Sequence, residues 1–117
     1  MDIEAIYQYC LTLPFAEESF PFDKETLVFK VFGKMFALLD LQSGKYINLK
    51  CDPETAEIYR ITYKAIVPGY HMNKRHWNTI YIDHDLPDEF IREMIFNSYQ
   101  LVVKSLPKKY RELCGIN

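Results

Sequence analysis

The chain is expected to fold as an α+β domain in which helices pack on an antiparallel sheet. Strand-like segments follow one another with short turns, which is typical of antiparallel groups and not of strands that alternate singly with helices. Near both ends of the chain, apolar residues recur at helical spacing. The resulting element order is α-β-β-β-α-β-β-α. With 117 residues and no internal repeat or flexible linker, residues 1–117 are expected to form a single domain.

The first half of the chain predicts one helix and an antiparallel meander. Apolar residues at helical spacing define the helix, and Pro14 ends it. The strands turn at Gly33-Lys34 and again at residues 42–45. The expected elements are a helix at residues 2–13, a packed loop at 17–24, and strands at 26–32, 35–41 and 46–50.

The second half begins with a helix whose start has a clear signal. Asp52 is a good N-cap, Pro53 suits the first helical position, and Glu54 complements the positive end of the helix dipole. Pro107 ends the last helix before a basic tail, Lys108-Lys109. The expected elements are a helix from residue 53 to about residue 62, strands at 63–67 and 79–83, and a long helix at 87–106.

Composition places the chain among globular intracellular proteins. Hydrophobic residues make up 49% and aromatic residues 15%, which supplies ample core and argues against disorder. No apolar run approaches the ~20 residues that cross a bilayer, and the acidic start is unlike a signal peptide. Cys10, Cys51 and Cys114 are odd in number and form no CxxC pair, which is typical of reduced thiols in the cytoplasm.

The charge distribution is more informative than the net charge of −2. Nucleic-acid-binding domains are usually basic overall, and this chain is not. Residues 58–82, however, contain no acid and include Arg60, Lys64, Lys74 and Arg75. This pattern predicts either a locally basic face or an ordinary solvated surface.

The run from residue 68 to residue 80 is the densest cluster of ligand-binding side chains in the chain. It lies between two strand-like segments, where binding residues are often carried on loops. Lys74 and Arg75 could neutralise phosphate, and Trp77 could stack on an unpaired base. The candidate DNA-binding residues in this run are His71, Asn73, Lys74, Arg75, His76, Trp77 and Asn78.

A structural interpretation of the same run stays open. Trp77 and Met72 would then anchor the connection to the core, and the two asparagines would bond its backbone. Lys34 and Lys45, expected at hairpin turns, are further candidates for phosphate contact. Lysine at a turn or strand edge is also the usual protection against edge-to-edge pairing.

The run and several spaced blocks resemble the MmcQ/YjbR family of small proteins. The resemblance covers nearly the whole chain and implies a two-layer α+β fold with a curved antiparallel sheet. It also implies a proposed double-wing mode of DNA contact, in which projecting hairpins grip the duplex. Phe32 departs slightly from the pattern, because a smaller residue is expected before Gly33. The other blocks are residues 29–31, 33–37, 48–54 and 98–103.

No catalytic, metal or cofactor motif is found. His71, His76 and His84 lack the spacing of a zinc site, and no glycine-rich phosphate loop or nucleophile–base motif occurs. Cys51 precedes a helix N-terminus, which can lower a thiol pKa, but the adjacent Asp52 opposes that shift. We therefore expect no enzyme, no metal and no cofactor.

The expected function is DNA binding without catalysis, through the 68–80 loop and the hairpin turns. Binding to double-stranded DNA would be weak and salt-sensitive, near the nonspecific range of about 10⁻⁴–10⁻⁶ M. One alternative is a protein-interaction domain that uses the sheet surface to bind a protein partner. The other is a small-ligand site at Tyr70, His71, Asn73 and Trp77. No membrane association is expected, and a monomer is favoured.

Overall fold

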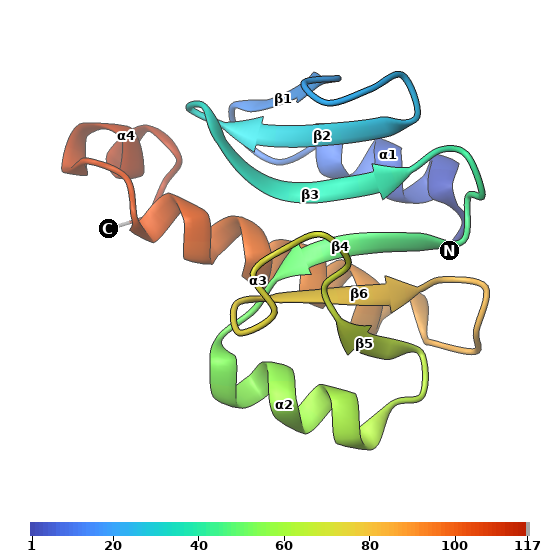
Figure 1. Ribbon diagram of the computed structural model, residues 1–117. Coiled ribbons are helices and arrows are strands. Elements are labelled where there is room, and N and C mark those ends of the chain that lie inside the picture. Colours follow the sequence, from blue (N-terminus) through green and yellow to red (C-terminus); the bar gives the residue numbers. More distant parts are fainter. Residues whose placement is uncertain (117) are drawn as a thin grey trace.

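A computed structural model describes residues 1–116, which form six strands and four helices (Figure 1). The strands make one sheet in the order β1-β2-β3-β4-β6-β5, and all neighbours are antiparallel. None of the helices in this part of the chain has the length and apolar character needed to cross a bilayer. The strands are β1 (Ala16–Ser19), β2 (Thr26–Val31), β3 (Lys34–Asp40), β4 (Tyr46–Lys50), β5 (Ile66–Pro68) and β6 (Trp77–Tyr81). The helices are α1 (Ile3–Leu11), α2 (Pro53–Thr62), α3 (Asp88–Lys104) and α4 (Lys108–Leu113).

The main core lies between the sheet and the helices α1 and α3, which cover one of its faces (Figure 1). Helical periodicity gives α3 one apolar face, and alternation along the strands directs every second side chain toward it. Tyr99 is buried at this contact, and its hydroxyl donates to the Pro14 carbonyl at 2.7 Å. Ser98 of α3 donates to the Phe36 carbonyl and accepts from the Lys50 amide, so that polar contacts also bind the helix to β3 and β4.

The opposite face of the sheet carries a second, smaller cluster. Val28, Leu38 and Trp77 are buried there, and Met35 and Met72 pack against them. The connection from β5 to β6 crosses in front of β4 and β6 in Figure 1 and contributes Met72 to this cluster. A connection between two strands therefore serves as the cover of a sheet face.

The expected α+β class is confirmed, but two elements were missed. Residues 17–24 were expected to be a loop, yet β1 pairs with β2 as an edge strand. Its sequence Ala-Glu-Glu-Ser has no apolar alternation, because a short edge strand can be held by backbone bonds alone. Helix α4 occupies the expected basic tail, and its six residues are too few to show helical periodicity.

Two strand boundaries also differ from the expectation. β5 covers Ile66–Pro68 instead of residues 63–67, and β6 covers Trp77–Tyr81 instead of residues 79–83. Trp77 and Asn78 therefore belong to a strand, and the connection itself is residues 69–76.

The β2–β3 turn explains the unusual Phe32. Val31 pairs with Lys34, so the turn has two central residues, and both have positive φ: 46° at Phe32 and 83° at Gly33. Such turns favour Asn-Gly, because a bulky side chain is strained in the left-handed region. The Phe32 ring packs against Tyr110 at 4.5 Å and Phe15 at 5.2 Å between centroids, which offsets that strain and holds α4 beside the turn.

Candidate functional site

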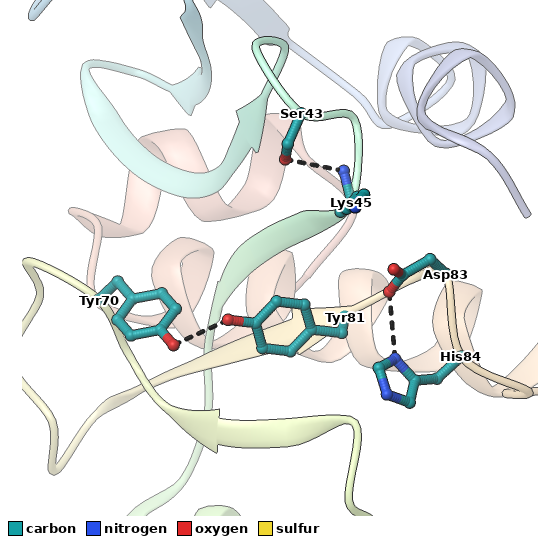
Figure 2. A network of polar contacts seen from close by, with 6 residues as sticks. All are labelled: Ser43, Lys45, Tyr70, Tyr81, Asp83 and His84. Atoms are coloured by element: carbon teal, nitrogen blue, oxygen red, sulfur yellow. Dashed lines mark hydrogen bonds and ion pairs between the residues drawn. The ribbon is translucent and has the colours of Figure 1, made fainter.

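The 69–76 connection begins with a close contact that requires glycine. A Cβ atom on Gly69 would lie 2.9 Å from the Cβ of Trp77, and the Gly69 amide donates to the Trp77 carbonyl. Next, the Tyr70 amide donates to the Thr79 hydroxyl at 2.9 Å. Figure 2 shows the Tyr70 hydroxyl directed at that of Tyr81, which donates to it at 2.8 Å. These contacts turn the connection back over the sheet.

Arg60 of α2 fastens the other end of the connection. Its Nε donates to the Asn78 Oδ1 at 2.7 Å, and its Nη2 donates to the carbonyls of Trp77 and Lys74. Asn78 is only 2% exposed, and its amide nitrogen is 3.5 Å from the Ala56 carbonyl oxygen. The strand, the connection and α2 thus meet at one guanidinium group.

Several of the predicted DNA-binding side chains are engaged within the protein. The Lys74 ammonium donates to the Gly69 carbonyl at 2.8 Å, and the Asn73 Oδ1 accepts from the Arg75 amide at 2.9 Å. Trp77 is 8% exposed and packs with Val28, so a base cannot stack on it without a rearrangement. Together with Asn78, these side chains stabilise the connection through hydrogen bonds and packing within the protein.

Asn73 and Lys74 are exposed despite these bonds, and the remaining members of the run also lie at the surface. His71 and Arg75 are exposed, and His76 is partly exposed. His71 has a φ of 58°, a left-handed conformation that is strained for any residue with a Cβ. The His76 carbonyl accepts from the Cys51 amide, which places Arg75 and His76 near the end of β4.

Lys34 and Lys45 do not share a surface. Lys34 stands at the β2–β3 turn, whereas Lys45 follows the turn at the other end of β3, a strand of seven residues or about 20 Å. Lys34 donates to the Ser105 hydroxyl at 3.3 Å, just beyond the end of α3. Lys45 instead lies near the turn that precedes β4, where its amide donates to Ser43 (Figure 2).

Several cations surround the end of the sheet at which Lys34 lies. The sequence analysis did not predict that they would lie together. Lys50 ends β4 and pairs in register with Trp77, and Lys104 ends α3. Helix α4, held beside the β2–β3 turn by the Phe32–Tyr110 contact, adds further lysines. We call this group the basic end; it consists of Lys34, Lys50, Arg75, Lys104, Lys108 and Lys109. Lys108 lies 3.8 Å from Glu112, and the other five are in no ion pair within residues 1–116.

The cysteines and histidines form no reactive or metal-binding constellation in the described part of the chain. No three His, Cys, Asp or Glu residues there are grouped so that they could hold a metal ion. His84 contacts Asp83 at 3.1 Å (Figure 2). Burial, followed by the charge of Asp52, raises the pKa of the Cys51 thiol to about 11, so at neutral pH it is protonated and a poor nucleophile.

Exposed apolar side chains, which a protein-interaction surface would need, occur both on α2 and at the edge of the covered sheet face, where Phe22 is 64% exposed. Ile61 is 87% exposed and Ile58 is 60% exposed, both on α2. On the sheet face itself, Val28, Leu38 and Trp77 are buried.

Comparisons with known proteins identify close relatives. The sequence profile of the YjbR family matches residues 11–101. The uncharacterized Escherichia coli protein YbdF is 40% identical over 107 residues, which is 91% of this chain and 88% of that protein. The uncharacterized Escherichia coli protein YjbR is 37% identical over 114 residues, 97% of each chain.

Solved structures agree with this relationship. The crystal structure of the Deinococcus radiodurans protein DR2400, described as a DUF419 domain, has a TM-score of 0.87 and 39% sequence identity, and the match covers 99% of this chain and 89% of that one. A crystal structure from Pseudomonas syringae has a TM-score of 0.76 and 29% identity, covering 87% and 99% of the two chains. Such agreement at these identities supports the same fold in all three proteins.

Proposed function

We propose that this chain, which belongs to the YjbR family, binds the phosphate backbone of double-stranded DNA at its basic end and performs no catalysis. The observation that supports the proposal is the grouping of six cations from β4, α3, α4 and two hairpin connections at one end of the sheet. Acids lie at both ends: Asp83, Asp85 and Asp88 lie between β6 and the first turn of α3 at the opposite end, whereas Asp52 and Glu112 lie beside the basic end. The proposal therefore rests on the local grouping of the cations, whose positive field attracts a polyanion.

Two hairpins would act as the wings. The β2–β3 turn carries Lys34, and the β5–β6 connection carries Arg75. Only β4 lies between β3 and β6, so the nearest strands of the two hairpins are two strand spacings apart and the hairpin centres are three apart. At the usual spacing of neighbouring strands, the separation is about 10–15 Å. The major groove of B-DNA is about 12 Å wide, so the two side chains would contact phosphates on opposite sides of one groove.

The proposal assigns phosphate contact to a smaller part of the 68–80 run than its composition suggests. The Arg75 guanidinium group makes no side-chain hydrogen bond within the described residues, whereas the ammonium of the exposed Lys74 donates to the Gly69 carbonyl, and Trp77 and Asn78 are buried. Four or five phosphate contacts with a slope of about 0.9 each predict affinity falling roughly 10²–10³-fold between 50 and 200 mM salt.

Fluorescence anisotropy of a labelled mixed-sequence duplex tests this proposal at about 50 and 200 mM salt. The test variant is Lys34→Ala/Arg75→Ala/Lys104→Ala. The matched control is Lys24→Ala/Lys45→Ala/Lys64→Ala, which removes the same charge from exposed lysines at the opposite end. We expect the test variant to lose binding and salt dependence, and the control to keep both.

Three outcomes would contradict the proposal. One is an absence of duplex binding by the wild-type protein at the lower salt concentration. Another is an equal loss in both variants, which would assign binding to net charge and not to the basic end. The third is a loss in the control alone, which would transfer the contact to the turn that carries Lys45. Circular dichroism establishes that each variant is folded.

A further inference from the structure

A cavity of about 290 Å³ lies on the sheet face opposite α3, and its lining includes Tyr70 and His71, two residues of the small-ligand alternative. It opens between the loop before β2, the strands β3 and β4, and the 69–76 connection. Its volume is at the lower limit of ordinary small-molecule sites. The side chains that decide its chemistry are Phe22, Asp23, Asp40, Tyr46, Asn48 and Tyr70.

Two carboxylates without counter-ions face this cavity. The Asp23 Oδ1 accepts from the amides of Glu25 and Thr26, and these bonds lower the pKa of Asp23. The Asp40 Oδ2 accepts from the amide and the hydroxyl of Ser43. The Thr26 side chain also hydrogen-bonds to Asp23, and neither carboxylate is in an ion pair within the described residues.

A buried amide with an unused donor also faces the cavity. Asn48 is 6% exposed, and its Oδ1 accepts from the Thr79 hydroxyl, which itself accepts from the Tyr70 amide. This chain of donors defines the orientation of the Asn48 amide. Its Nδ2 donates to no acceptor in residues 1–116, although Asn48 lines the cavity. The buried side-chain atoms without a partner in the described residues are Ser19 Oγ and Arg92 Nη1, so solvent reaches the Asn48 Nδ2, and this donor is available to an acceptor in the cavity.

Aromatic rings complete the wall. Tyr46 and Tyr70 meet at 75° with centroids 5.8 Å apart, forming a right-angled corner. Phe22 is 64% exposed at the cavity wall. Burial, and then the charges of Asp40, Tyr70 and Asp23, raises the pKa of Tyr46, which is consistent with both carboxylates acting on this ring. Aromatic faces attract cations, and so do carboxylates.

We propose that this cavity binds a small organic cation: an amine with an apolar or aromatic body and one hydrogen-bond acceptor. The ammonium group lies between the carboxylates of Asp23 and Asp40, the body packs in the corner of Tyr46 and Tyr70, and the acceptor accepts from the Asn48 side-chain amide. The basic side chain that lines the cavity itself is His71, and Lys24 and Lys45, both exposed, are adjacent in the chain to Asp23 and Tyr46. This site is independent of the basic end and of DNA binding.

Three isosteric probes separate charge from shape: tyramine carries an ammonium group, tyrosol a neutral hydroxyl in its place, and 4-hydroxyphenylacetate a carboxylate. Each is titrated into the wild-type protein and followed by two-dimensional NMR. We expect tyramine to bind at least tenfold more tightly than the other two. We also expect its shifts to be centred on the Asn48 side-chain amide and the backbone of Tyr46 and Tyr70.

A matched pair of variants tests the carboxylates. Asp23→Asn/Asp40→Asn keeps an oxygen to accept the turn hydrogen bonds and removes two charges, and it should lose at least tenfold in affinity for tyramine. Asp83→Asn/Asp85→Asn removes the same charge elsewhere and should bind as the wild type does. If the first variant does not fold, the three-probe comparison on the wild type still decides.

Several results would overturn the proposal. One is the absence of tyramine-induced shifts up to about 10 mM, which is about tenfold above a Kd of about 1 mM. Equal binding of the three probes would assign the site to apolar contact alone. Equal weakening in both variants, or shifts centred away from Asn48, would refute the assigned site.

Discussion

Removal of the Arg60 side chain should destabilise the protein more than removal of any other exposed or half-exposed cationic side chain. Its guanidinium group donates three hydrogen bonds that join α2 to Asn78, Trp77 and Lys74. The Arg60→Ala change withdraws all three donors at once. It leaves the Asn78 Oδ1 in a site that is 2% exposed, where water cannot readily replace the lost partner.

The magnitude follows from these contacts. A hydrogen bond to a charged group contributes about 1.5–3 kcal/mol, and an unsatisfied buried acceptor costs about 1–3 kcal/mol. The carbonyls of Lys74 and Trp77 lie near the surface and regain water, and Arg60 itself is partly exposed, so the contributions do not add fully. We expect a loss of about 2–4 kcal/mol, or a Tm lower by about 10 °C for a chain of this size.

Urea unfolding followed by circular dichroism measures this loss. Lys64→Ala removes the same charge from a nearby exposed position and should change stability by less than about 0.5 kcal/mol. Arg60→Lys keeps the charge but not the fork of donors, so it should recover less than half of the loss. Hydrogen exchange should also accelerate at the Trp77 amide, which donates to the Asn73 carbonyl. A loss below about 1 kcal/mol in Arg60→Ala would refute the view that this group fastens the connection.

Three further predictions address other parts of the molecule. Ser98→Ala should cost about 1–3 kcal/mol in urea unfolding, because the Lys50 amide and the Phe36 carbonyl both lose a buried partner; a neutral result would contradict this. Because the pKa of Cys51 is raised to about 11, its alkylation by iodoacetamide at neutral pH should be about 100-fold slower than that of a free thiol, as measured by mass spectrometry. The rate should still rise between about pH 9 and pH 10, and a plateau there would be inconsistent with the raised pKa. Phe32→Asn should be more stable than Phe32→Ala by about 1 kcal/mol, since both lose the ring contacts but asparagine tolerates the φ of 46°; equal stabilities would mean that the turn is unstrained.

Local patterns in the sequence were sufficient for the fold class and most elements. The start of α2 was read from Asp52 and Pro53, and the Asp52 side chain does accept from the Thr55 amide at the N-cap. The three central strands were recognised as apolar runs between turns, which fits their burial on both faces of the sheet, and α3 was recognised from its helical spacing. β1 and α4 lack such a pattern and were missed.

The roles of the side chains in the 68–80 run were decided only by contacts between distant segments. Trp77 could stack on a base or fill a core by its residue type alone, and the position of Val28 and Leu38 beneath it determines that it is buried. Lys74 and Asn78 depend in the same way on Arg60, which lies 14 and 18 positions earlier.

The sequence by itself therefore determined the α+β class, the family resemblance and most element boundaries to within a few residues. The tertiary structure decided which cations share an end of the sheet and which polar groups face a cavity. Lys34 and Lys45 are separated by one strand length, whereas Asn48 and Thr79 lie 31 positions apart and share a hydrogen bond. The physical reason is that periodicity reports which face of a segment is buried, while the neighbours on that face are chosen by the pairing of strands that are distant in the chain.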